Sequence, residues 1–133
     1  MGALSRTRVI PLADYPLGSR TFVVPSPIED DATAIYAEFA RCTSADPSIW
    51  PNQSTRLKVS CEISLDGGTE WKFLASFMAE GGIFLDAQGA EGPVSAMNIP
   101  LPFGVLRRVR FSVDVTGNVG SVLRTTGFIE LRN

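Results

Sequence analysis

The fold is decided by residues 55–78, which read TRLKVSCEISLDGGTEWKFLASFM. From Leu57 to Ile63, apolar and polar residues alternate strictly, which is the pattern of a strand with one buried face. After the turn sequence DGG at residues 66–68, the alternation resumes at Trp71. The stretch therefore predicts a β-hairpin of two half-buried strands.

The buried faces restrict the register of this hairpin, because a slip of one residue moves every side chain to the opposite face. The register that keeps the apolar residues together pairs Ile63 with Trp71, Cys61 with Phe73, Val59 with Ala75 and Leu57 with Phe77. It also places Glu62 opposite Lys72 on the outer face, as an opposite-charge pair. The loop is then Asp66, Gly67 and Gly68, with Gly68 as a bulge residue of positive φ.

Further strands follow from the same pattern. Residues 108–115 and 119–125 predict a second hairpin around a turn at 116–118, with Val115 opposite Val119 and Phe111 opposite Leu123. Weaker strands are expected at 6–12, 20–24, 33–41, 83–86, 94–99 and 127–132. The acidic residues before 33–41 would also suit a helix N-terminus, but the alternation of Ile35, Ala37 and Phe39 favours a strand.

Short strands separated by Pro, Gly and Asp clusters about every 8–12 residues are typical of two packed antiparallel sheets. The sequence therefore predicts an all-β antiparallel β-sandwich of jelly-roll or immunoglobulin-like type, with about eight strands. A chain of 133 residues has room for one core, so residues 1–133 are expected to form a single domain with a short N-terminal arm.

The composition argues against several classes of function. The chain has no His, so Ser/His/Asp triads and His-based metal sites are unavailable, and no catalytic, cofactor-binding or metal-binding residue is predicted. A net charge of -2 gives no field that would attract nucleic acid or an anionic membrane. Without a signal peptide or a long apolar stretch, a soluble protein made in the cytoplasm is expected. Its cysteines, Cys42 and Cys61, are expected to be buried thiols, with a disulfide between them as the alternative.

Arg residues outnumber Lys residues ten to two, and Arg suits bidentate contacts with carboxylates at protein interfaces. The candidate interface residues are the basic cluster, the N-terminal arm and an aromatic residue among prolines: Arg107, Arg108, Arg110, Arg6, Arg8 and Trp50. The alternatives are a solvated strand face for the arginines and a ring folded over the sandwich end for Trp50. The apolar, proline-rich segment 97–103 cannot lie in a sheet centre, so it is expected at a sheet edge, against a neighbouring subunit, or as a loop that covers the core.

The sequence SLDGGTEW at residues 64–71 resembles the Asp-box hairpin of sialidase-type propellers. The matching residues are Ser64, Asp66, Gly68 and Trp71, while Glu70 stands where the motif has Thr. In such a hairpin the Asp accepts hydrogen bonds from turn amides and the Trp covers the base, so the motif is structural. A single copy cannot build a propeller, and pairing of Glu62 with Lys72 disfavours Glu62 and Glu70 as glycosidase carboxylates.

The hairpin, the strand RVRFSVDV at 108–115 and the compact architecture resemble small virion proteins of tailed bacteriophages. Cement or decoration proteins of capsids are the nearest type. The resemblance implies a non-enzymatic structural protein of the virion that bridges subunits of the major capsid protein as a homodimer or homotrimer. The alternatives are a phage tail or baseplate component, and a carbohydrate-binding β-sandwich that stacks sugars on Trp50, Tyr15 and Tyr36. An enzyme is disfavoured because it would have to work with carboxylates and Arg alone.

Overall fold

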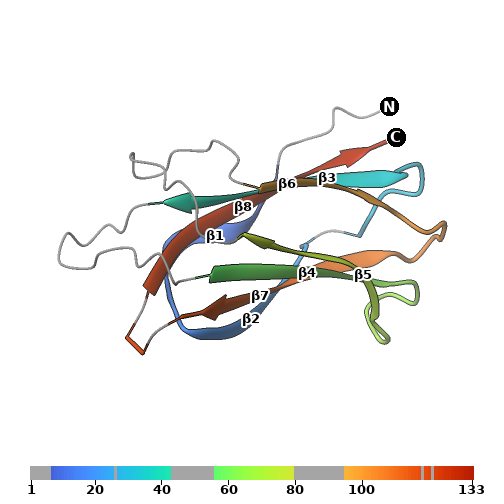
Figure 1. The fold of residues 1–133 in the computed structure, drawn as a ribbon. Coiled ribbons are helices and arrows are strands. Elements are labelled where there is room, and N and C mark those ends of the chain that lie inside the picture. Colours follow the sequence, from blue (N-terminus) through green and yellow to red (C-terminus); the bar gives the residue numbers. More distant parts are fainter. Residues whose placement is uncertain (1–6, 26, 43–55, 80–94, 118, 121) are drawn as a thin grey trace.

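The computed structural model of the chain describes residues 7–25, 27–42, 56–79, 95–117, 119–120 and 122–133 (Figure 1). In these residues the chain forms eight strands and no helix. The strands are β1 (Thr7–Pro16), β2 (Gly18–Val23), β3 (Ala34–Cys42), β4 (Arg56–Ser64), β5 (Lys72–Ala79), β6 (Ser95–Pro100), β7 (Arg108–Thr116) and β8 (Val122–Arg132).

The strands form two antiparallel sheets of four, which pack face to face as a β-sandwich (Figure 1). One sheet has the order β1-β8-β3-β6 and the other the order β2-β7-β4-β5. Consecutive strands lie in different sheets, except for β4 and β5, which pair as a hairpin. The predicted all-β antiparallel sandwich of about eight strands is confirmed.

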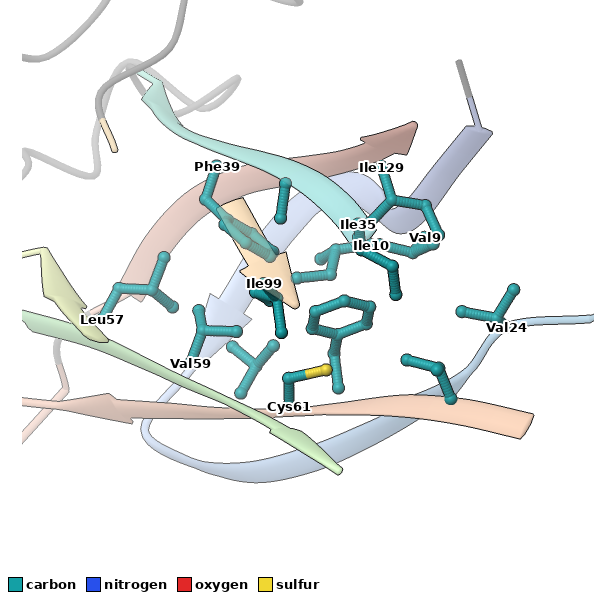
Figure 2. Packing of buried hydrophobic residues seen from close by; sticks show 14 of the residues in the cluster. Val9, Ile10, Val24, Ile35, Phe39, Leu57, Val59, Cys61, Ile99 and Ile129 are labelled. Carbon is teal, nitrogen blue, oxygen red and sulfur yellow. The ribbon is translucent and has the colours of Figure 1, made fainter. Parts of the chain in front are cut away.

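The core lies between the two sheets and is built by the alternation seen in the sequence (Figure 2). The inward residues of β4 are almost fully buried: Leu57, Val59, Cys61 and Ile63. Phe39 of β3 and Phe111 of β7 meet across the sandwich, with their ring centroids 5.8 Å apart. Burial of these apolar faces is the main stabilising contribution to such a two-layer fold.

The β4–β5 hairpin forms as predicted, but its register differs by two residues from Leu57 to Cys61 and by one residue at Glu62 and Ile63. The observed partners include Leu57 with Ala79, Val59 with Phe77, Cys61 with Ala75, Glu62 with Phe73 and Ile63 with Lys72. The connection runs from Leu65 to Trp71, longer than the predicted loop, because side-chain hydrogen bonds hold these residues outside the ladder. The last paired residues before the turn are Ile63 and Lys72, so the loop between the paired strands is longer than in a tight hairpin.

A bulge in β5 changes which side chains face the core. Between the pairs of Cys61 and Glu62 the register shifts by one residue, so Leu74 is the extra residue in β5. Leu74 packs against the core, whereas Phe73 is 65% exposed on the outer face. The predictions that Phe73 lies inside, that Glu62 pairs with Lys72 and that Gly68 is the bulge residue are wrong, whereas the predicted positive φ of Gly68 is confirmed at 111°.

The second predicted hairpin does not form, because β7 and β8 belong to different sheets. Both edges of β7 are occupied, by β2 and β4, and both edges of β8 are occupied, by β1 and β3. The connection after Thr116 therefore crosses from one sheet to the other. β8 also continues through Gly127, where the sequence suggests a boundary between two strands.

The weaker predicted strands are largely confirmed. Segments 6–12, 20–24 and 94–99 correspond to β1, β2 and β6, and 33–41 forms strand β3. The predicted strand 83–86 lies outside the described residues. β6 is an edge strand, as expected for a proline-rich segment, and residues 101–103 continue into the connection to β7.

Candidate functional site

Three connections meet at one end of the sandwich, and we call them together the hairpin end (Figure 1). They are residues 24–33 between β2 and β3, 65–71 between β4 and β5, and 101–107 between β6 and β7. The amide of Gly67 donates a hydrogen bond to the carbonyl oxygen of Leu106 over 3.0 Å, and the amide of Ile28 donates to the carbonyl oxygen of Arg107 over 2.9 Å. These bonds join the three connections into one surface.

The 65–71 connection is ordered from within by two side chains. The Ser64 hydroxyl donates to Asp66 Oδ1 over 2.6 Å and accepts a hydrogen bond from the Gly68 amide over 2.9 Å. Asp66 Oδ1 also accepts hydrogen bonds from the amides of Thr69 and Glu70, each over 3.0 Å. The bond from Ser64 and the turn amides lower the pKa of Asp66, so its carboxylate stays ionised and keeps the turn in shape. Acceptance of the turn amides is the role that the Asp-box resemblance implies.

The 101–107 connection is held by Arg107, which is only 1% exposed. Its Nη1 donates to the carbonyl oxygens of Ala32 at 2.8 Å and Pro102 at 3.1 Å, and its Nη2 donates to that of Glu29 at 2.5 Å. Arg107 therefore binds the backbone of two connections from inside the protein. This is a correction, because the sequence suggests Arg107 as a residue that contacts a partner.

Large apolar side chains are exposed on two of the three connections, and we call them the apolar patch. Its members are Leu65 at 40%, Val105 at 65%, Leu106 at 59% and Phe103 at 88% exposed. Leu65 packs against Gly104, since a Cβ on that glycine would lie 3.2 Å from Leu65 Cδ2. Exposed apolar side chains gathered at one end of a protein are a candidate contact surface for a partner.

Acidic residues lie at the same end of the sandwich as the apolar patch. The hairpin end carries five carboxylates and one guanidinium, and these residues are Glu29, Asp30, Asp31, Asp66, Glu70 and Arg107. All five acidic residues are exposed. The whole chain has a net charge of only -2, so this end is more acidic than the rest of the protein.

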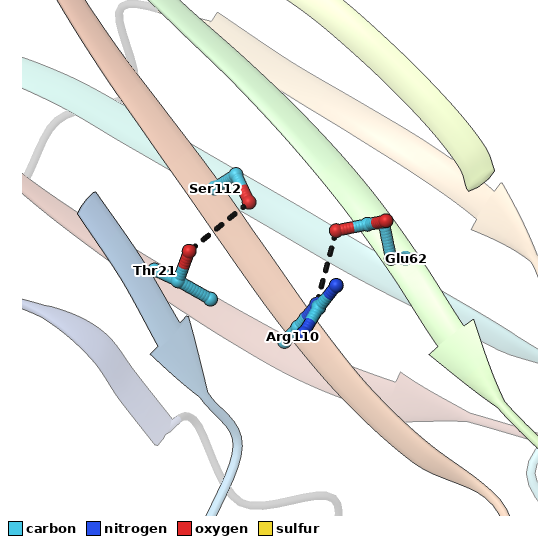
Figure 3. Close-up of polar contacts among 4 residues, drawn as sticks. All are labelled: Thr21, Glu62, Arg110 and Ser112. Carbon is cyan, nitrogen blue, oxygen red and sulfur yellow. Dashed lines mark hydrogen bonds and ion pairs between the residues drawn. The ribbon is translucent and has the colours of Figure 1, made fainter. Parts of the chain in front are cut away.

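Arg108 and Arg110 lie on the outer face of the β2-β7-β4-β5 sheet, but both already have partners in the protein. Arg110 Nε is 3.0 Å from Glu62 Oε1 (Figure 3). The Arg110 guanidinium also lies 4.4 Å from the centroid of the Trp71 ring. Arg108 Nη2 donates to the carbonyl oxygen of Val24 over 3.1 Å. Both guanidinium groups therefore stabilise contacts within the protein, and neither is a free positive charge on its surface.

Arg8 lies on the other sheet, where it donates to Thr126 Oγ1 and stacks 4.4 Å from the centroid of the Phe128 ring. The structure therefore places Arg8 away from Arg108 and Arg110, and the predicted interface residues do not form one surface. Arg6 and Trp50 lie outside the described residues.

Several of the described arginines stack their guanidinium groups on aromatic rings. Besides Arg8 and Arg110, Arg132 lies 4.5 Å from the ring centroid of Tyr36 and Arg20 lies 5.4 Å from that of Tyr15. A planar guanidinium can stack and still donate hydrogen bonds, which an ammonium group does less well. These contacts cover Tyr15 and Tyr36, two of the three aromatic residues suggested as a sugar platform.

Cys61 is a free, buried thiol, and burial raises its pKa to about 12. The side chain of Cys42 lies outside the described part. Among the described residues, no group of three or more His, Cys, Asp or Glu side chains could hold a metal ion. Likewise, no helix in the described part is long and apolar enough to cross a membrane.

Comparison of the chain with protein-family models, with curated proteins and with solved structures finds no match.

Sequence reasoning missed most of the hairpin end. It drew attention to Phe103 through the segment 97–103, but not to Leu65, Val105 and Leu106. The signal is the run LPFGVL at 101–106, which is apolar and has no alternation. A run of that kind at the end of a predicted edge strand would have indicated an exposed apolar loop.

Proposed function

We propose that the chain is a non-enzymatic structural protein of a tailed-phage virion, which attaches to the capsid and bridges subunits of the major capsid protein. The apolar patch on a rigid end of the sandwich is the observation that carries this proposal. Protein interfaces have an apolar core of this kind, and a few well-ordered side chains contribute most of the binding energy. Phe103, at 88% exposed, would be the principal contact residue.

The rigidity of the hairpin end supports a mechanical role. Arg107 and Asp66 fix the backbone of the connections that carry the patch, so little conformational entropy is lost when a partner binds. A cement protein resists internal pressure through many repeated contacts, and each contact gains from such preorganisation.

We also infer that the sandwich is of the jelly-roll type. The pairs β1–β8, β2–β7, β3–β6 and β4–β5 describe a long double strand that doubles back at the β4–β5 hairpin and is rolled into two sheets. An immunoglobulin-like sandwich keeps its first two strands in one sheet, whereas β1 and β2 lie in different sheets here. Jelly rolls occur in viral capsid and lectin domains, so the fold type agrees with the proposal by analogy only.

The proposal includes assembly into dimers or trimers, since a bridging protein must engage more than one subunit. Analytical ultracentrifugation of the purified protein tests this part separately. A monomer that still binds capsids would restrict the proposal to decoration without bridging.

The main experiment mixes the protein with capsids and, separately, with tails purified from the phage that carries the coding sequence, followed by sedimentation. We expect the protein to sediment with capsids. Phe103→Ser should reduce attachment, and Val119→Ser is the matched control, because Val119 is 99% exposed in the connection between β7 and β8. Attachment to tails alone would make the chain a tail or baseplate component, and attachment to neither would overturn the proposal.

A second candidate function is carbohydrate binding on the outer face of the β2-β7-β4-β5 sheet. Four hydroxyl residues lie in register across the sheet, and they are Thr21, Ser112, Ser60 and Ser76. Phe73 is exposed on the same face of β5, and the hydroxyls of Thr21 and Ser112 are 3.4 Å apart (Figure 3). Retardation on immobilised polysaccharide that is lost in Phe73→Ser, but kept in Phe103→Ser, would favour this function.

A further inference from the structure

We propose that the hairpin end recognises a protein surface on which apolar side chains are ringed by Lys and Arg. This inference rests on the proposed function and names the chemistry of its partner. It follows from the charges around the apolar patch, which differ from the charges elsewhere on the protein.

The five carboxylates of the hairpin end form no ion pair with any described residue. They are Glu29, Asp30, Asp31, Asp66 and Glu70. Three other described acidic side chains form ion pairs with arginines: Asp14 with Arg124, Glu62 with Arg110 and Glu130 with Arg132, whereas Asp114 accepts a hydrogen bond from Ser19. Unpaired charge is therefore concentrated at the end that also exposes the patch.

The guanidinium groups that contact the hairpin end do not pair with these carboxylates. The guanidinium of Arg107 is buried and donates to the backbone carbonyl oxygens of Glu29, Ala32 and Pro102. Arg108 donates to the Val24 carbonyl oxygen, and Arg110 pairs with Glu62 and lies over the Trp71 ring, so neither neutralises the five acidic side chains. A basic partner would therefore meet carboxylates that no described Lys or Arg neutralises.

The acidic loops are held in place, so their charges have a defined position beside the patch. The Ala32 amide donates to the Glu29 carbonyl oxygen over 3.1 Å, which closes a turn with Asp30 and Asp31 at its tip. Asp66 is fixed by Ser64 and by two turn amides. A fixed rim of one sign steers a partner of opposite sign and excludes partners of the same sign.

The same charges argue against two other occupants. In a twofold-symmetric dimer the patch would meet itself, and the acidic rims would then face each other and repel. A membrane surface rich in anionic lipids would also repel this end. A protein surface with apolar side chains ringed by Lys and Arg would pack against the apolar patch and form ion pairs with the carboxylates.

The first test uses three synthetic peptides of equal length, with alternating Lys and Leu, Glu and Leu, or Lys and Ser. Binding is followed by the amide signals of the ¹⁵N-labelled protein. The Lys/Leu peptide should perturb residues 65–71 and 101–107, more weakly as salt rises, because exposed charges are screened over about 10 Å at 0.1 M. The Glu/Leu peptide lacks the positive charge and the Lys/Ser peptide lacks the apolar side chains, so both should bind at least tenfold more weakly. Equal binding of the Glu/Leu peptide would overturn the inference.

The second test uses variants and assembled capsids. The double variant Asp30→Asn and Asp31→Asn should slow association about threefold or more and flatten its salt dependence, since rim charges act mainly on the association rate. Asp114→Asn is the control, because Asp114 lies on the outer sheet face, 3.0 Å from Ser19 Oγ. Both variants keep an amide that can replace the carboxylate in local hydrogen bonds.

The outcomes separate this inference from the proposed function. If Phe103→Ser abolishes capsid attachment and the Asp30/Asp31 double variant does not change it, the docking function stands and the basic-rimmed partner is rejected. If the protein never binds capsids, the virion function fails, and the peptide series still decides the chemistry of the site. Self-association that is lost in Phe103→Ser, or binding to anionic phosphatidylserine vesicles, would overturn the inference directly.

Discussion

Gly127 of β8 lies directly opposite Phe39 of β3, and the Phe39 ring occupies the space that a side chain at 127 would need. A Cβ on Gly127 would lie 2.6 Å from Phe39 Cδ1 and 3.1 Å from Ile10 Cδ1. Gly127→Ala should therefore lower the free energy of unfolding by about 1–3 kcal/mol, the usual cost of overpacking a core. The measurement is urea denaturation. Combination with Phe39→Leu should recover about 1 kcal/mol relative to the sum of the single changes, and additive effects would contradict the close contact.

Arg107 should be among the residues most important for stability, although it is charged. Arg107→Met removes the donors for three carbonyl oxygens in a buried place, and we expect a loss of about 3 kcal/mol in the free energy of unfolding. Arg132→Met is the control, because its side chain is 46% exposed and exposed ion pairs contribute less than about 1 kcal/mol. Hydrogen exchange should also become faster in 101–107 in the Arg107 variant. Equal effects of the two changes would contradict the internal role of Arg107.

Asp66 should make the stability of the hairpin end depend on pH. Hydrogen bonds to its carboxylate lower the pKa of Asp66 in the folded state. The contribution of Asp66 to the free energy of unfolding is therefore complete above the pKa of an ordinary carboxyl group, and it is lost as pH falls through the pKa of Asp66 in the folded protein. Thermal melting of the protein and of Asp66→Asn should therefore differ at neutral pH and converge in acid. A difference that stays constant down to low pH would show that the ionised carboxylate is not what holds the turn.

Cys61 should be inert in the folded protein. A thiol with a pKa of about 12 is ionised in roughly one molecule in ten thousand at pH 8, and the thiolate is the reactive form. Iodoacetamide followed by mass spectrometry should leave the Cys61 peptide unmodified in buffer and modified in guanidinium chloride. Rapid labelling without denaturant would mean that the core opens far more often than this packing implies.

The corrected β4–β5 register can be tested by double-mutant cycles. Glu62 contacts Arg110 on β7, and both side chains are about a quarter exposed, so Glu62→Gln with Arg110→Gln should give a coupling energy of about 0.3–1 kcal/mol. Glu62→Gln with Lys72→Gln should give almost none. Coupling to Lys72 instead would restore the register that the sequence suggests.

The sequence predicts features that depend on neighbouring residues better than features that depend on distant strands. Strict alternation identifies β4 and its buried face, and the motif at 64–71 identifies the hydrogen bonds of Asp66. The register of β5 depends on the extra residue Leu74 and on a longer loop, and neither changes the local pattern of polar and apolar residues. Sheet order is equally hidden, because β7 and β8 look like a hairpin until their edges are known to be occupied by other strands.

The candidate site shows the same division. Arg107 stands next to Arg108 and close to Arg110 in the chain, so composition alone groups the three. Burial separates them, since Arg107 lies in a connection whose backbone carbonyls surround it, while Arg108 and Arg110 project outward from β7. The acidic residues and the apolar patch are distant in sequence, and only the fold brings them to one end.

The nested pairing of the strands also determines how the chain reaches its native state. Only β4 and β5 are neighbours both in sequence and in a sheet, so their hairpin is the one pairing that requires a short loop to close. The pairs β3–β6, β2–β7 and β1–β8 enclose progressively longer segments, and each becomes easier once the pair inside it has formed. Folding should therefore proceed outward from the hairpin that carries Asp66, and slowly, as in other proteins dominated by contacts between distant residues. The turn that carries Asp66 at the hairpin end is thus also the place where folding is expected to begin.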